Sequence, residues 1–213
     1  MFRSKAALLL GWIWMAFAAL NTVDLILRYR GSASAIAAVV LAVLTVLVFV
    51  TCLRPAIILT EDGVLVRNPL RNTFVPWSQV EEVTVSHSIK ITAGGRSVRC
   101  WTPQASGRER AAAARRARPV SARGRYRTEP ARPKGEQAAA EALAGKTHAD
   151  WVGEQITERA EAARRTAAAQ ALQAAPTAPE TGEPEPVKVT WAPTALAALL
   201  AALILAGLFL VTV

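Results

Sequence analysis

The segment that decides the fold lies between Arg54 and Trp101, where the chain reads RPAIILTEDGVLVRNPLRNTFVPWSQVEEVTVSHSIKITAGGRSVRCW. Apolar and polar residues alternate here in short runs, which is the period of half-buried β-strands. Turn-forming residues separate the runs at positions 61–63, 68–72 and 93–95. Because the loops are short, the pattern predicts an antiparallel meander of six strands. We expect these strands at Ala56–Thr60, Val64–Asn68, Thr73–Val75, Val80–Val85, Ile89–Thr92 and Ser97–Trp101.

One sheet of this size has an apolar face that another element must cover, and a helix further along the chain is suited to it. Thr147 and Asp150 form the Thr-x-x-Asp pattern of an N-terminal helix cap. From there to Leu172, apolar residues such as Ile156 recur at intervals of three and four. We therefore predict an amphipathic helix that packs on the sheet, with Trp151 and Ile156 in the core.

Three long apolar runs flank this unit: residues 6–27 and 35–53 precede it, and residues 191–213 follow it. At about 1.5 Å per residue, each run is long enough to cross a hydrocarbon layer of roughly 30 Å. We predict three transmembrane helices. A cleaved signal peptide is an alternative for the first run, but its apolar part is too long and a second apolar run follows closely.

The charges beside the three runs predict their orientation. If the N-terminus is inside, Arg28 and Arg30 are the only basic residues near span ends that lie outside. Basic residues beside membrane spans are enriched on the cytoplasmic side. The strands are therefore expected in the cytoplasm, beneath the plasma membrane. The six basic residues placed inside are Arg3, Lys5, Arg54, Arg67, Arg71 and Lys188.

The expected fold class is an α+β membrane protein: three transmembrane helices and a small antiparallel β domain closed by a C-terminal helix. Composition divides the chain into six segments. They are residues 1–53 with two spans, 54–102 with the sheet, 103–146 as a basic insert, 147–172 as the amphipathic helix, 173–190 as a Pro- and Glu-rich linker, and 191–213 as the third span.

The strand segment contains several packing and turn motifs. They are Arg54-Pro55-Ala56-Ile57, Gly63-Val64, Asn68-Pro69-Leu70-Arg71, Val75-Pro76-Trp77 and the strand Val80–Val85. In these motifs the chain resembles the small bacterial PH-like domains of actinobacterial membrane proteins, a group labelled after low molecular weight protein antigen 6. The resemblance covers residues 54–102, the helix from Thr147 and the pair of N-terminal spans. It implies a curved PH-like sheet closed by a helix, and none of its motifs is catalytic.

Charge is concentrated in the insert, where residues 102–134 hold ten Lys and Arg against two acidic residues, a net charge of +8. Beside an anionic leaflet, each such residue contributes on the order of 1 kcal/mol to binding. Nucleic acid is a weaker candidate, because only Tyr126 offers a ring for base stacking. A third possibility is that the insert reflects compositional drift and contacts nothing specific. The candidate contacts to anionic lipid or a protein partner are Arg67, Arg71, Arg96, Arg99, Arg108, Arg110, Arg115, Arg116, Arg118, Arg123, Arg125 and Arg127.

Catalytic signatures are weak in the sequence. It has two histidines and two cysteines, Cys52 and Cys100, too few for a metal site or a disulfide framework. Residues 140–147 match a permissive phosphate-loop pattern, but strong helix formers precede the Gly-Lys-Thr, so we interpret Gly145 as a helix stop. We expect no enzyme activity, no cofactor and no metal, with both thiols reduced.

The sequence therefore favours a membrane-anchored interaction module that binds a protein partner and anionic lipid head groups. The alternative is a small transporter or channel subunit that uses Asp24, the one acidic residue within the apolar runs. Because Asp24 lies one helical turn before Arg28, an ion pair at the helix end explains it without transport.

Overall fold

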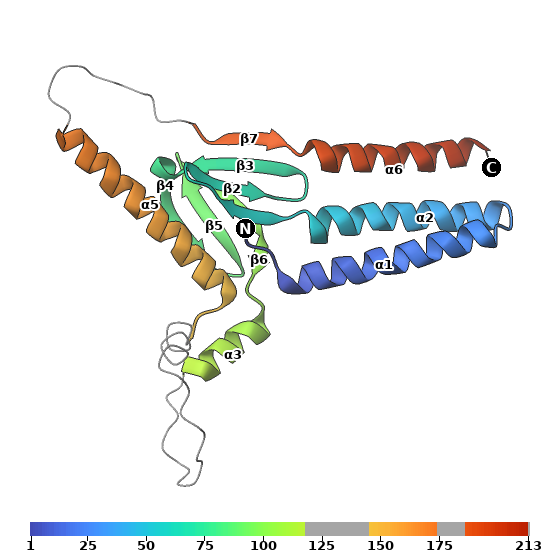
Figure 1. Cartoon of the computed structure of the whole chain (residues 1–213), viewed down its shortest axis with the longest axis horizontal. Coiled ribbons are helices and arrows are strands. Elements are labelled where there is room, and N and C mark those ends of the chain that lie inside the picture. The colour runs from blue at the N-terminus through green and yellow to red at the C-terminus, as the bar shows by residue number, and fades with distance from the viewer. Residues whose placement is uncertain (118–144, 174–185, 213) are drawn as a thin grey trace, which may run out of the picture.

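The computed structural model describes residues 1–117, 145–173 and 186–212. Three apolar helices extend from one side of a β domain, and a further helix covers that domain on the other side (Figure 1). The helices are α1 (Lys5–Leu27), α2 (Ser32–Val48), α3 (Gly107–Ala117), α5 (His148–Gln173) and α6 (Pro193–Thr212), with a π-helical turn η1 (Phe49–Leu53) and a 3-10 turn η2 (Trp77–Gln79).

The β domain consists of two antiparallel sheets, one in the order β1-β2-β3-β7 and the other in the order β4-β5-β6. All six expected strands are present as β1 to β6. The largest difference is at β6, which continues to Gln104, so the first residues of the expected insert belong to the sheet. The strands are β1 (Ala56–Leu59), β2 (Gly63–Arg67), β3 (Arg71–Pro76), β4 (Val80–Val85), β5 (Ser88–Ala93), β6 (Arg96–Gln104) and β7 (Lys188–Trp191).

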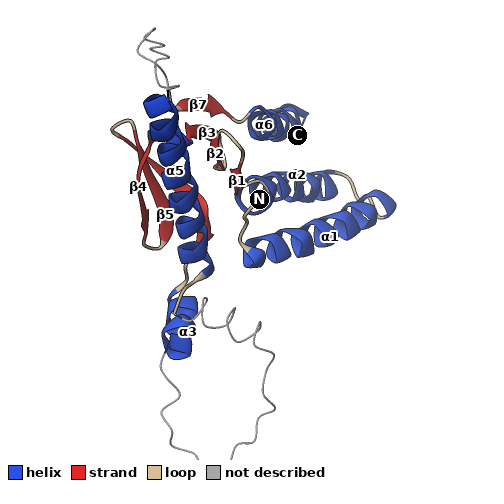
Figure 2. Cartoon of the chain, turned by 60° about the vertical axis from the view of Figure 1, so that its left-hand side comes forward, coloured by secondary structure: helices blue, strands red, loops and turns tan. Residues whose placement is uncertain are grey.

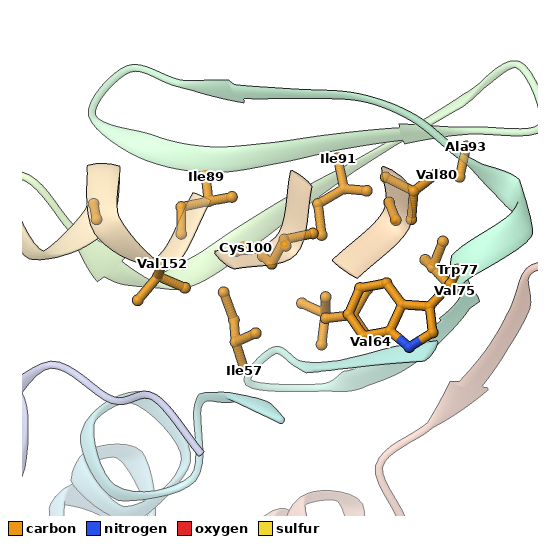
Figure 3. Close-up of a cluster of buried hydrophobic side chains, with 14 of the residues drawn as sticks. Ile57, Val64, Val75, Trp77, Val80, Ile89, Ile91, Ala93, Cys100 and Val152 are labelled. Carbon is orange, nitrogen blue, oxygen red and sulfur yellow. The ribbon is translucent and has the colours of Figure 1, made fainter. Parts of the chain in front are cut away.

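The core lies between the two sheets and helix α5 (Figure 3). Val64, Ile57 and Ile91 from the sheets are fully buried, and Ile156 from α5 is buried against them. The expected role of Ile156 in the core is thus confirmed. Trp151 is half-buried and packs edge-on against Phe2, with ring centroids 5.4 Å apart.

Helix α5 begins with the cap that the sequence predicts. The Thr147 backbone N–H donates to Asp150 Oδ2 at 2.8 Å, and the Asp150 backbone N–H donates to Thr147 Oγ1 at 3.2 Å. One turn later, Gly153 allows the helix to approach β4, because a Cβ at this position would lie 2.5 Å from Val85 Cγ2. The cap fixes where α5 starts, and the glycine fixes how closely it packs.

Strand β7 corrects the expected boundaries near the end of the chain. Residues 188–190 were expected in a linker and Trp191 in a membrane span, but Lys188–Trp191 pairs antiparallel with β3. Helix α6 starts only at Pro193, where proline is favoured because its missing N–H has no partner to lose in the first helical turn. A four-residue run carries too little periodicity to be recognised as a strand without its distant partner.

Helix α2 lies beside both α1 and α6 (Figures 1 and 2). Trp14 Nε1 of α1 donates to Thr45 Oγ1 of α2 at 3.2 Å, which links the first two helices. Lys5–Leu27 and Ser32–Leu53 have the length and composition of membrane spans. The apolar stretch of α6 counted over 193–209 is shorter, so the third expected span does not reach the same length among the described residues.

The two cysteines are unpaired. Cys100 is buried in the core between the sheets, and this burial raises the pKa of its thiol to about 12. The side chain is therefore neutral at physiological pH and packs as a small apolar group.

Candidate functional site

A cavity of about 590 Å³ lies where the apolar helices meet the sheet β1-β2-β3-β7. One part of its wall is polar and contains three arginines, and another part is apolar. Its apolar part includes residues two to three turns into α1, so the cavity reaches from the β domain towards the helix bundle. The lining residues are Arg3, Trp12, Met15, Phe49, Leu53, Arg54, Leu65, Arg67, Asn72, Pro193 and Thr194.

Each arginine reaches the cavity from a different element. Arg3 lies between α1 and the bridge that pairs Phe2 with Ile57. Arg54 directly follows η1, and Arg67 is the last residue of β2. Because α1 begins at this junction and η1 and β2 end there, residues far apart in sequence come together around one cavity.

Arg54 is held in place by the turn between β2 and β3. Its Nη1 donates to the carbonyl oxygens of Asn68 and Pro69, the latter at 3.1 Å, and its Nη2 donates to Asn72 Oδ1 at 2.6 Å. Burial, and then the positive charge of Arg67, lower the pKa of Arg54 below its ordinary value. Arg54 is thus a structural residue that also brings charge to the cavity.

The cavity carries positive charge without a facing carboxylate. None of its lining residues is acidic. In the described part of the chain, the ion pairs join Asp24 to Arg28 and Lys146 to Glu154, away from this cavity. The Arg3 Nε is buried and has no hydrogen-bond partner among the described residues. With three arginines and no acidic residue in its lining, the cavity suits an anion.

The sequence analysis named twelve arginines as candidate contacts, and among those that the structure describes, Arg67 alone lines the cavity. Arg71 lies on β3, where its guanidinium is 4.9 Å from the ring centroid of Trp191. Arg96 and Arg99 lie on β6 in the other sheet. The Arg99 Nε donates to Ser88 Oγ at 3.0 Å, which holds β6 against β5.

The remaining candidates belong to the basic insert. Its first part forms the helix α3. The side chains of Arg108, Arg110 and Arg115 are exposed on this helix. Arg116 is also in α3, but only its backbone is described. The last four candidates, Arg118, Arg123, Arg125 and Arg127, lie outside the described residues.

The cavity includes two arginines that the sequence analysis did not propose as contacts, Arg3 and Arg54. Both were counted only as basic residues that orient the spans. The available signal was that they stand next to span ends on the side of the β domain. Their convergence with Arg67 could not be predicted, because it depends on how α1 and β2 meet.

Asp24 has the surroundings that its spacing predicts. Arg28 Nε lies 3.1 Å from Asp24 Oδ1, and the two side chains are 73% and 61% exposed, respectively. A separate cavity of about 710 Å³ between α1 and α2 has a mostly apolar lining that does not include Asp24. The carboxylate therefore does not line a path between these helices.

The phosphate-loop pattern is only partly described, because residues 140–144 lie outside the described residues. Gly145 has φ of +83°, a conformation that favours glycine and is common at the end of a helix. Lys146 Nζ contacts Glu154 Oε2 at 2.6 Å. This lysine is engaged by a carboxylate, and Thr147 caps α5.

Comparison with known proteins identifies the β domain. Residues 54–121 match the family model described as Bacterial PH domain. The match covers strands β1 to β6 and helix α3. No curated protein matches the chain, and no solved structure does. The chain thus contains a bacterial PH domain, preceded by two apolar helices that have the length and composition of membrane spans.

Proposed function

We propose that this protein is a membrane-anchored, non-enzymatic interaction module that holds its PH-like domain at the cytoplasmic face of the plasma membrane. The observation that carries the proposal is the direct connection of the apolar helices to one sheet. Phe2 pairs with Ile57 just before α1 begins. Only two residues separate η1 from β1, and a single residue, Ala192, separates β7 from α6. Such short connections would keep the domain at the membrane surface.

The proposal includes three spans, with α6 as the third. Helix α6 is apolar and lies beside α2, which together with η1 has the length of a span. The excess of basic residues on the side of the β domain supports its cytoplasmic placement. The sequence motifs and the N-terminal helix pair also support a place in the actinobacterial antigen-6 group.

Among the described residues, no group of three or more His, Cys, Asp or Glu side chains is placed to hold a metal. The alternative role, transport through Asp24, has less support because that carboxylate pairs with Arg28 at the helix end. We therefore favour binding over transport.

The surface proposed for the protein partner is the outer edge of β7. At the opposite edge of this sheet, Phe2 pairs with β1. In the second sheet, β4 has an irregular register between Val80 and Glu82, and β6 contacts β1. Irregular or covered edges pair poorly with another strand. All four residues of β7 are exposed, including Val189 and Trp191.

The register indicates which backbone groups of β7 face outward. The Ala192 N–H donates to the Leu70 carbonyl at 2.9 Å, and the next pairs are Trp191 with Arg71 and Thr190 with Asn72. In an antiparallel ladder, hydrogen-bonded and non-hydrogen-bonded pairs alternate. The N–H groups of Val189 and Trp191 therefore point away from β3. An extended segment of a partner could accept hydrogen bonds from them.

Photo-crosslinking in native membranes tests the proposed edge. A photoreactive phenylalanine derivative at the position of Val189 is expected to give a discrete crosslinked species with one protein partner. The same derivative at Thr84, which is exposed on β4, is the matched control and should not give that species. Equal crosslinking from both positions, or none from Val189, would contradict partner binding at β7.

A further inference from the structure

We propose that the cavity at the junction binds the phosphate group of one anionic phospholipid, with Arg3 and Arg67 contacting the phosphate and the acyl chains lying against Trp12 and Met15. The inference rests on the proposed membrane anchoring, because only an anchored domain presents this cavity to a leaflet. It names a ligand for a place that is distinct from the β7 edge and from the basic insert.

The first argument is the unsatisfied charge. Neither Arg67 nor Arg3 has a carboxylate partner among the described residues. Arg54 adds a third positive charge, although its guanidinium already donates to the β2–β3 turn. A phosphate group offers several acceptor oxygens, and arginine binds it in a fork geometry. One anion would therefore balance positive charge that no carboxylate among the described residues neutralises.

The second argument is the division of the cavity wall. Arg3 and Arg67 line its polar part, whereas Trp12, Met15 and Phe49 line its apolar part. Helix α1 begins at Lys5, so Met15 lies about 15 Å along the helix at 1.5 Å per residue. This places cationic groups at the start of the helix and apolar groups deeper in the bundle. A phospholipid has the same order of head group and chain.

The third argument selects among lipids. The lining residues include three guanidinium groups and no carboxylate. An ammonium-bearing head group, as in phosphatidylethanolamine, would bring a fourth positive charge to this place, and like charges disfavour binding. Phosphatidylglycerol carries the phosphate without the amine. The volume of about 590 Å³ is in the range of small-molecule sites.

Native mass spectrometry of the full chain in mild detergent tests the proposal by titration with three probes. Phosphatidylglycerol is expected to bind as a single adduct about tenfold more tightly than phosphatidylethanolamine with the same acyl chains. Inorganic phosphate is the third probe and distinguishes a lipid from a free anion. Equal binding of the two lipids, or binding of inorganic phosphate as tight as that of phosphatidylglycerol, would overturn the assignment to an anionic lipid.

Variants locate the site. Arg67→Gln and Arg3→Gln should each weaken phosphatidylglycerol binding by about tenfold, because hydrogen bonds to charged groups contribute the most. Arg159→Gln removes the same charge from an exposed position on α5 and should leave binding unchanged. An equal loss in Arg159→Gln would show a diffuse charge effect and contradict the cavity.

Melting temperatures of the variants show whether they fold. Neither Arg3 nor Arg67 anchors the β2–β3 turn as Arg54 does, so both glutamine variants should melt near the parent temperature. The test uses the full chain purified in detergent. Its result therefore does not depend on which side of the membrane the β domain occupies or on whether a protein partner is bound. Failure of lipid binding in a chain that still fractionates with membranes would therefore overturn only this inference, and not the proposed anchoring.

Discussion

At the scale of single residues, Gly63 shows how closely strands β2 and β3 approach. A Cβ on Gly63 would lie 2.4 Å from the Val75 carbonyl oxygen and 3.0 Å from Pro76 Cα. Both are backbone atoms of β3, so they cannot move aside without opening the β2–β3 ladder. Gly63→Ala should lower the free energy of unfolding by about 2 kcal/mol, measured by denaturation of the full chain in detergent. Gly107→Ala, where a Cβ meets nothing within 4 Å, should change it by less than about 0.5 kcal/mol. Equal effects at both positions would refute the close-approach argument.

At the scale of elements, β7 is held in the sheet by backbone hydrogen bonds along the edge that pairs with β3. Thr190 is paired with Asn72, and its N–H points towards β3 by the alternation described above. Thr190→Pro removes that N–H and should lower the free energy of unfolding by about 1–2 kcal/mol. Val189→Pro removes an N–H that points outward, and edge strands tolerate proline at such positions. It should have a clearly smaller effect, with both variants compared by thermal denaturation of the full chain. A larger loss of stability in Val189→Pro than in Thr190→Pro would show that the N–H groups of β7 have been assigned to the wrong edges.

The same elements show what the sequence could and could not predict. Strands β1 to β6 are joined by short turns, so each meets its partner within a few residues and alternation suffices to locate it. Strand β7 pairs with β3, whose residues Arg71–Pro76 lie more than a hundred positions earlier, and nothing local marks that pairing. The cavity could not be predicted from the sequence for the same reason, because Arg3, Arg54 and Arg67 come together only in the assembled fold.

At the scale of the whole molecule, the proposed sidedness has a direct test. Two single-cysteine probes are introduced into a chain that carries Cys52→Ser. Arg30→Cys places a thiol in the loop between α1 and α2, and Ser78→Cys places one on the exposed surface of the β domain. A membrane-impermeant maleimide added to intact cells should label the first and spare the second until the membrane is permeabilised. Cys100 should stay unlabelled in both, because it is 1% exposed. Labelling of Ser78→Cys in intact cells would place the domain outside.

The pairing of β7 with β3 also has a mechanical consequence. Helix α6 follows β7 after a single residue and lies beside α2, which leads through η1 into β1 of the same sheet. With so little slack, a sideways displacement of α6 away from α2 within the bilayer would pull directly on the β3–β7 ladder. A force that separates the helices would therefore break the hydrogen bonds between β7 and β3. A partner bound at the outer edge of β7 would be displaced by the same movement.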